Sequence, residues 1–121
     1  MPVSQTFREL ALDQLGRCTR GLKSRSMFGG VGIYAGSLFF ALLAEDRLYL
    51  KTDETSRPDY EARGWPAFFP FGDASKPMHY HEVPLEVIEN AGELQPWVDQ
   101  ALAVAQRAAR GKKVPAKMRR S

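Results

Sequence analysis

Three short apolar runs and two turn signals make up residues 27–53, MFGGVGIYAGSLFFALLAEDRLYLKTD. The runs are Val31–Tyr34, Ser37–Ala44 and Arg47–Thr52, and they are separated by Ala35-Gly36 and Glu45-Asp46. Short apolar runs joined by such turn residues are typical of consecutive β-hairpins. We therefore predict a three-stranded antiparallel meander, in which glycine supplies backbone freedom at its start and first turn.

The apolar pattern of the meander predicts which of its strands are covered. Ser37–Ala44 is apolar almost throughout, which is typical of a central strand with both faces covered. In the third run, Leu48 and Leu50 alternate with Arg47, Tyr49 and Lys51, so one face is more polar. The buried set of the second run is Phe39, Ala41 and Leu43 or its complement, because a slip of one residue exchanges the two faces.

The glycines at 29, 30 and 32 admit two interpretations. Gly30-x-Gly32 resembles the start of a dinucleotide-binding fingerprint, but the third glycine is missing and Ile33-Tyr34 continues as a strand. A phosphate site of that kind needs the helix N-terminus that is absent here. We therefore interpret the cluster as structural, marking a bulge or a close approach of two backbones.

Amphipathic helices are predicted near both ends of the chain. Residues 4 to about 20 have an apolar face that includes Leu15 and Cys18, and Thr6 and Glu9 have the spacing of a capping box. We expect Cys18 to be a small buried hydrophobe. The second helix is Leu94–Ala109, with Trp97 as the residue that anchors it to the sheet and Gly111 as its end.

Two further strands follow the meander. Ala67–Phe71 lies between prolines and is rich in phenylalanine, which favours an edge strand. Pro77–Val83 alternates and is predicted to be a half-buried strand. The fold class is therefore α+β: a single antiparallel β-sheet of about five strands, with the N- and C-terminal helices packed on one face.

Charge divides the chain into an acidic domain, residues 1–109, and a basic tail, residues 110–121. From residue 107 onward there are seven basic residues and no acidic one, whereas residues 1–106 carry ten basic and fourteen acidic residues. We expect the tail from Lys112 to be disordered, because it has no hydrophobic periodicity. Apolar runs are too short to span a membrane and no secretory signal is visible, so we expect a cytoplasmic protein that does not contact the membrane.

The sequence contains no recognisable catalytic or metal-binding constellation. His79 and His81 are two positions apart on a strand, so they share one face as two zinc ligands can, but no other histidine or cysteine stands near them in the sequence. We interpret both as solvated strand residues. The carboxylates lie in turns and connectors, and no Ser-His-Asp or Cys-His group is evident. We therefore predict a non-enzymatic protein without catalytic residues, metal or cofactor.

Four motifs in this order resemble the N-terminal domain of the TfoX/Sxy family. They are Met27-Phe28-Gly29-Gly30-Val31-Gly32-Ile33-Tyr34, then Phe40-Ala41-Leu42 followed by Leu48-Tyr49-Leu50-Lys51, then Tyr80-x-x-Val83-Pro84, and Leu94-x-x-Trp97-x-x-x-Ala101. The resemblance implies a stand-alone domain with a fold similar to that of small bacterial secretion chaperones. It also implies transcription regulation, including competence genes, together with an activator of the cyclic-AMP-receptor type, and it brings no active-site residues.

Two functional hypotheses follow for the binding partner. The first is a regulatory domain that binds a protein of the transcription machinery through aromatic side chains: Tyr34, Tyr49, Trp65, Phe68, Phe69 and Phe71. The alternative is weak, non-specific nucleic-acid binding through the basic residues of the C-terminal segment: Arg107, Arg110, Lys112, Lys113, Lys117, Arg119 and Arg120. An available sheet edge also favours a homodimer.

Overall fold

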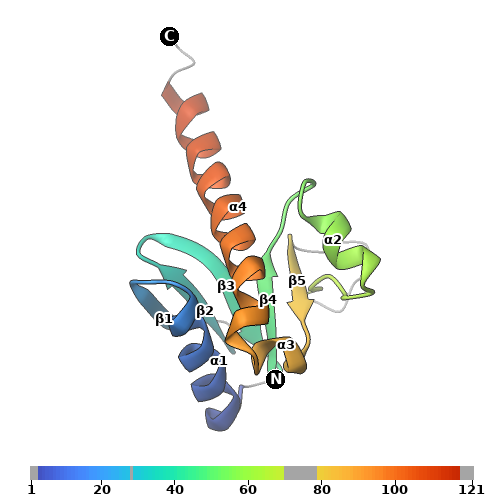
Figure 1. The fold of residues 1–121 in the computed structure, drawn as a ribbon. Coiled ribbons are helices and arrows are strands. Elements are labelled where there is room, and N and C mark those ends of the chain that lie inside the picture. The colour runs from blue at the N-terminus through green and yellow to red at the C-terminus, as the bar shows by residue number, and fades with distance from the viewer. Residues whose placement is uncertain (1–2, 28, 70–78, 118–121) are drawn as a thin grey trace.

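The computed structural model describes residues 3–27, 29–69 and 79–117, and for residues 111–117 it describes the backbone alone. Five strands form one antiparallel sheet in the order β1-β2-β3-β4-β5, so each strand pairs with its neighbour in sequence (Figure 1). The strands are β1 Leu22–Met27, β2 Gly30–Ala35, β3 Leu38–Ala44, β4 Arg47–Lys51 and β5 Tyr80–Val83. The predicted α+β class and strand number are thus confirmed.

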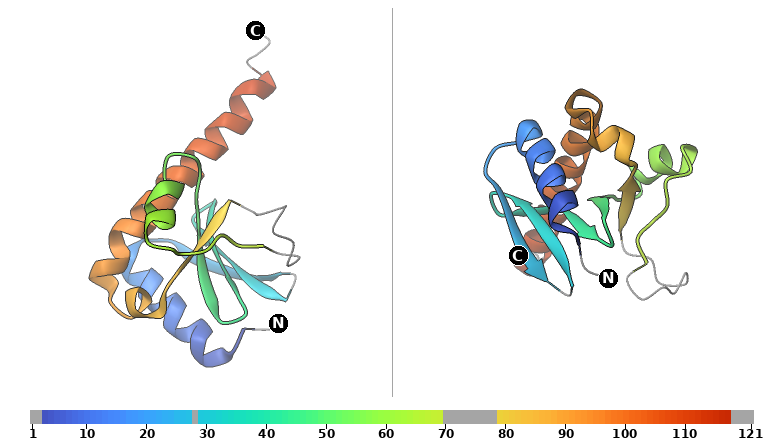
Figure 2. Two further views of the ribbon diagram at one scale, coloured as in Figure 1. Left: turned by 90° about the vertical axis from the view of Figure 1, so that its right-hand side faces the viewer. Right: turned by 90° about the horizontal axis from the view of Figure 1, so that it is seen from below.

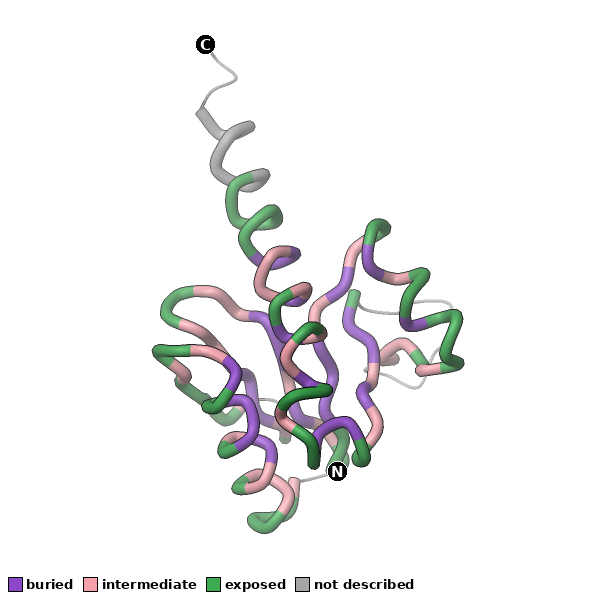
Figure 3. The backbone as a smooth tube through the Cα atoms, viewed as in Figure 1, coloured by how far each residue is buried: buried purple, intermediate pink, exposed green. Residues whose placement is uncertain are grey.

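Three of the four helices cover one face of the sheet (Figure 2). The helices are α1 Gln5–Cys18, α2 Arg57–Ala62, α3 Leu85–Ile88 and α4 Ala91–Lys117. Helix α4 crosses β3 and β4 and contacts α1 and α3, whereas α2 lies beside β5. The core lies between α4 and the sheet, where Leu94, Val98 and Ala101 are fully buried (Figure 3).

A β-bulge at Phe40 determines which side chains of β3 face the helices. Ile33 pairs with Ala41 and Tyr34 pairs with Phe39, so Phe40 is an extra residue in β3. Phe40 and Ala41 therefore both belong to the core, while Phe39 lies on the other face. Neither alternating set expected for β3 is correct along its whole length, because the bulge changes the phase.

Tight turns and one close backbone contact fix the meander. Glu45 and Asp46 have φ values of 53° and 57°, as the two central residues of a type I′ hairpin turn require. A Cβ atom on Gly30 would collide with the carbonyl oxygen of Leu43 on the neighbouring strand. The structural interpretation of this glycine, a close approach of two backbones, is confirmed.

One strand of the sheet was not predicted, and one predicted strand does not form within the described residues. Residues 22–27 form β1, although their polar sequence was not predicted to be a strand. In the described part of Ala67–Phe71, only an isolated bridge from Ala67 to His81 forms in place of the predicted strand. Phe71 lies outside the described residues.

The helix ends also differ from the prediction. Ser4 caps α1 by accepting a hydrogen bond from the Phe7 backbone N–H, so Thr6 and Glu9 are not the capping box. Helix α4 passes Gly111 and continues to Lys117, beyond its predicted end and into the segment expected to be disordered. A glycine costs a helix only about 1 kcal/mol, and the alanine, lysine and arginine around it are strong helix formers.

We expect the Gly30→Ala variant to lose about 1–3 kcal/mol of unfolding free energy, because the added methyl group meets rigid backbone. Gly16 is a matched control within α1, where an added Cβ makes only an ordinary contact with Leu22. Gly16→Ala should therefore stabilise the protein by about 0.5–1 kcal/mol. Urea unfolding followed by circular dichroism measures both changes, and equal stability of the two variants would contradict the close contact at Gly30.

Candidate interaction surface

Aromatic side chains form a row on the sheet face opposite the helices. The ladder places Tyr34, Phe39, Tyr49 and Tyr80 there, because their sequence neighbours Ile33, Leu48, Leu50 and His81 point to the helix side. The Tyr34 and Phe39 rings stack with centroids 4.9 Å apart, and the Phe39 and Tyr80 centroids are 5.9 Å apart. Together with Phe68, these four residues are called the outer aromatic row.

Phe68 joins this row from the connector that runs along β5. The Phe68 backbone N–H donates to the Tyr80 carbonyl, and the Glu82 N–H donates to the Pro66 carbonyl, each at 2.9 Å. The Phe68 ring then lies over Tyr49, with their centroids 4.6 Å apart. The connector therefore covers the free edge of β5 and extends the aromatic row past it.

The phenols of Tyr49 and Tyr80 stay neutral at physiological pH because their pKa values are raised. Burial raises the pKa of Tyr80 to about 12, and the nearby Tyr34 adds to the shift. Burial, followed by the negative charge of Glu82, also raises the pKa of Tyr49. The Lys51 ammonium lies 5.1 Å from the Tyr80 ring centroid, a cation–π distance. The row thus combines aromatic rings with tyrosine hydroxyl groups, the chemistry enriched in protein interfaces.

The structure separates the aromatic residues predicted to form one surface. It brings Tyr34, Tyr49 and Phe68 to the outer face, and it places Phe69 next in the connector with a half-buried side chain. Trp65 belongs to another cluster, with Tyr60 of α2 and Trp97 of α4. The ring centroids of Trp65 and Trp97 are 4.9 Å apart.

This second cluster holds the connector against α4. Tyr60 is fully buried and its ring centroid is 4.8 Å from that of Trp97. The Arg63 guanidinium lies 4.9 Å from the Trp97 ring centroid and 5.7 Å from that of Trp65. Trp97 thus fastens α2 and the connector to α4, rather than fastening α4 to the sheet as predicted.

The two histidines lie in different environments. His79 is exposed, but His81 is only 3% exposed, and its Nδ1 lies 3.0 Å from the Thr52 hydroxyl. The prediction that both are solvated is wrong for His81, because Tyr60 of α2 packs over its ring. Burial lowers the pKa of His81, although Glu61 opposes the shift, so the imidazole is neutral at pH 7. No three His, Cys, Asp or Glu side chains among the described residues are grouped to hold a metal ion.

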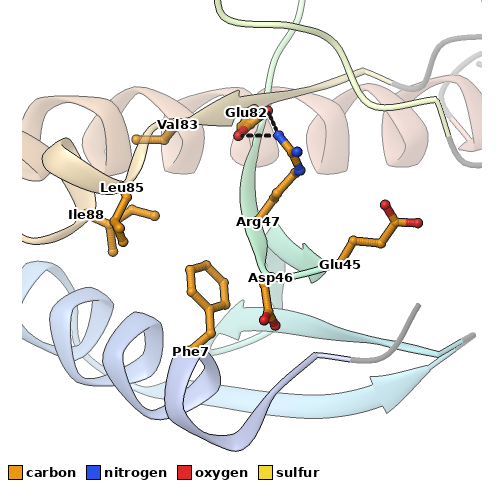
Figure 4. Close-up of a pocket in the computed structure, with 8 residues that line it drawn as sticks. All are labelled: Phe7, Glu45, Asp46, Arg47, Glu82, Val83, Leu85 and Ile88. Carbon is orange, nitrogen blue, oxygen red and sulfur yellow. Dashed lines mark hydrogen bonds and ion pairs between the residues drawn. The ribbon is translucent and has the colours of Figure 1, made fainter.

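An open groove of about 360 Å³ lies between the start of α1, the β3–β4 turn and the β5–α3 junction (Figure 4). Phe7, Val83, Ile88 and the half-exposed Leu85 supply its apolar side. Its charged side consists of Glu45, Asp46, Arg47 and Glu82. One Arg47 Nη lies 3.1 Å from both carboxylate oxygens of Glu82. Serine, cysteine and histidine are absent from the described residues that line it, so these residues supply no nucleophile of the triad type.

Of the seven basic residues predicted to contact nucleic acid, Arg107 forms an ion pair within the domain. An Arg107 Nη is 2.8 Å from Asp53 Oδ2 and 3.0 Å from the Thr55 hydroxyl. Asp53 also accepts hydrogen bonds from Thr55 and Ser56 at the start of α2. Arg110 is exposed on the projecting part of α4. The remaining five are Lys112, Lys113, Lys117, Arg119 and Arg120, and their side chains lie outside the description.

Sequence reasoning missed Phe39 and Tyr80 as members of the outer row. Phe39 could not be assigned to a face, because a bulge leaves no trace in the apolar pattern. Tyr80 carried a usable signal, since it alternates with His79 and His81 in Pro77–Val83.

None of the helices in the described ranges is long and apolar enough to cross a membrane.

Residues 13–105 match the family model described as the TfoX N-terminal domain. The match covers more than three quarters of the chain and includes every strand of the sheet. No curated protein matches the chain.

The ion pair between Asp53 and Arg107 predicts a pH-dependent stability. Partial burial opposes ionisation of Asp53, but hydrogen bonds from Thr55 and Arg107 prevail and lower its pKa from 3.8 to about 2. Because the folded pKa lies below the unfolded one, the stabilisation is complete above about pH 5 and disappears as the pH falls toward 2. We expect Asp53→Asn to cost about 1 kcal/mol at pH 7 and almost nothing near pH 2.

Urea unfolding followed by tryptophan fluorescence at several pH values measures this difference. Arg107→Gln is the matched control, because it removes the ion pair and leaves the Asp53 turn at the start of α2 intact. It should cost less than Asp53→Asn. A penalty for Asp53→Asn that stays constant between pH 7 and pH 2.5 would contradict the assigned pKa.

Proposed function

The chain belongs to the TfoX N-terminal domain family, and on this basis we propose that it is a non-enzymatic regulatory domain that binds a protein partner through the outer aromatic row. The observation that carries the proposal is this row itself, which lies on the sheet face away from α1, α3 and α4. Tyr34, Phe39 and Phe68 are the half-buried members of the row, whereas Tyr49 and Tyr80 are buried beneath their neighbours. Partly exposed tyrosine and phenylalanine side chains are enriched in protein interfaces.

Family membership supports a partner within the transcription machinery. The proposed partner is RNA polymerase or an activator of the cyclic-AMP-receptor type, and control of competence genes is the finer form of this role. Such a role places the protein in the bacterial cytoplasm. A domain of this kind contributes contacts to an assembly and not chemistry.

A second candidate function is non-specific nucleic-acid binding by the end of α4. It is favoured by the projection of α4 beyond the sheet, with exposed residues from 106 to 110 and no acidic residue from 107 to 121 (Figures 1 and 3). Arg107 contributes little to it, because its guanidinium is bound to Asp53. Contacts of this kind reach phosphates and read no bases.

We expect a photo-crosslinking amino acid in place of Tyr34 to join the domain to purified RNA polymerase or its activator. Tyr34 is half-buried in the outer row, and a benzoyl-phenylalanine keeps its aromatic character. The same group in place of Glu86, exposed on α3 at the helix side, is the control. Crosslinks at 34 and not at 86 support the proposal, and equal yields at both positions, or none at 34, would overturn it.

The nucleic-acid candidate predicts a salt dependence that point variants reduce. Full-length protein in which Arg110, Lys112 and Lys113 are glutamines should bind a short DNA duplex more weakly. If all three contact phosphates, the slope of log K against log salt should fall by about 2–3. Arg17→Gln, a cation already paired with Asp13 on α1, serves as control. Fluorescence anisotropy at two salt concentrations measures this slope, and a slope that the substitutions leave unchanged would exclude phosphate contact by these residues.

A further inference from the structure

Strand β1 has one free edge in the described structure. It pairs with β2 through six residue pairs in uninterrupted register, from Leu22 opposite Ala35 to Met27 opposite Gly30. On its other side, no residue in the described ranges pairs with it. Four consecutive residues, Lys23–Ser26, are exposed. The opposite edge of the sheet differs, because residues 66–68 already cover β5.

The hydrogen-bond pattern identifies which backbone groups of β1 point outward. The Gly36 N–H donates to the Gly21 carbonyl at 2.9 Å, so Gly21 and Gly36 are a hydrogen-bonded pair. In an antiparallel ladder such pairs alternate with non-bonded ones. Lys23, Arg25 and Met27 therefore bond to β2, whereas the N–H and C=O groups of residues 22, 24 and 26 point to the free edge. These three residues can accept a further strand without disturbing the ladder.

The charges on β1 specify what kind of strand fits. Lys23 and Arg25 share the outer face of the sheet, opposite Tyr34 and Gly32 of β2. Both are exposed, and neither has an ion-pair partner among the described residues. The side chains on the helix side are the small Ser24 and Ser26. An incoming strand with acidic residues at alternate positions would meet both cations directly.

We propose that the edge of β1 binds an extended acidic segment of a partner protein, which adds to the sheet as a further strand. A second copy of this chain fits less well. In antiparallel pairing of two β1 strands about Ser24, Lys23 of each copy faces Arg25 of the other, and like charges at such positions repel. The inference rests on the proposed protein-binding function and extends it, since the added strand would pair with β1, whose Lys23 lies opposite Tyr34 of the outer aromatic row.

A peptide of alternating glutamate and valine tests this proposal with the full-length protein. We expect it to bind in a fluorescence anisotropy titration, and the corresponding lysine–valine peptide not to bind. Ser24→Pro should weaken binding by about tenfold or more, because proline removes an outward N–H and blocks the edge. The same N–H makes no bond to β2, so circular dichroism should show the sheet intact.

Two matched variants separate strand addition from other causes. Ser24→Ala removes the 3.4 Å contact with Arg8 but keeps the N–H, so its affinity should stay within about twofold of the unchanged protein. Arg25→Glu should reduce binding about tenfold, whereas Arg110→Glu, a reversal on the projecting end of α4, should have little effect.

Three results would overturn the proposal. They are no binding of the acidic peptide, equal binding by Ser24→Pro and Ser24→Ala, or an equal loss in Arg25→Glu and Arg110→Glu. Sedimentation of the protein alone tests the competing occupant, because a dimer that Ser24→Pro dissociates would assign the edge to a second copy. A crosslink at position 34 without peptide binding would leave the proposed function standing and reject this inference alone.

Discussion

The packing of α4 across β3 and β4 is the constraint on which the rest of the structure depends. Leu94, Val98 and Ala101 are fully buried against a sheet face formed by residues with the same burial. Those sheet residues include Ala41, Leu43, Leu48 and Leu50. Because Ala101 of α4 and Ala41 of β3 are small, the helix can approach the strands closely. A register slip in β3 or β4 would exchange the two faces and remove this core, so the packing also fixes the outer aromatic row.

The local features of the fold were predictable, and those set by tertiary contact were not. The β3–β4 turn follows from the polar pair Glu45-Asp46 between two apolar runs, of which aspartate is a residue enriched at positive φ. The role of Gly30 follows from its place in the glycine cluster at the start of β2. Strand β1 was missed because LKSRSM has no apolar alternation and is extended through its pairing with β2. His81 is buried because Tyr60 of α2, an element distant from β5 along the chain, packs over its ring. Propensity and periodicity carry no information about such partners.

The division of the aromatic residues has a simple geometric cause. The connector runs extended along β5, and side chains of an extended chain alternate between faces. Phe68 follows Trp65 by three positions, an odd offset, so the two side chains point to opposite sides: Trp65 toward α4 and Phe68 toward Tyr49. The predicted surface could have been divided in this way from the sequence, given the edge strand expected there. The prediction instead grouped residues by their closeness along the chain.

The ion pair of Asp53 and Arg107 lies at the boundary between the acidic domain and the basic end of α4. Up to Arg107, α4 is held by the acidic body, and Asp53 at the same time orders the start of α2. From Ala108 to Arg110 the described side chains are exposed, and the helix continues away from the sheet. The basic end of α4 projects beyond the sheet (Figure 2), whereas the outer aromatic row lies on the sheet face itself. The protein-binding and nucleic-acid-binding roles proposed for this domain therefore use separate surfaces and do not compete.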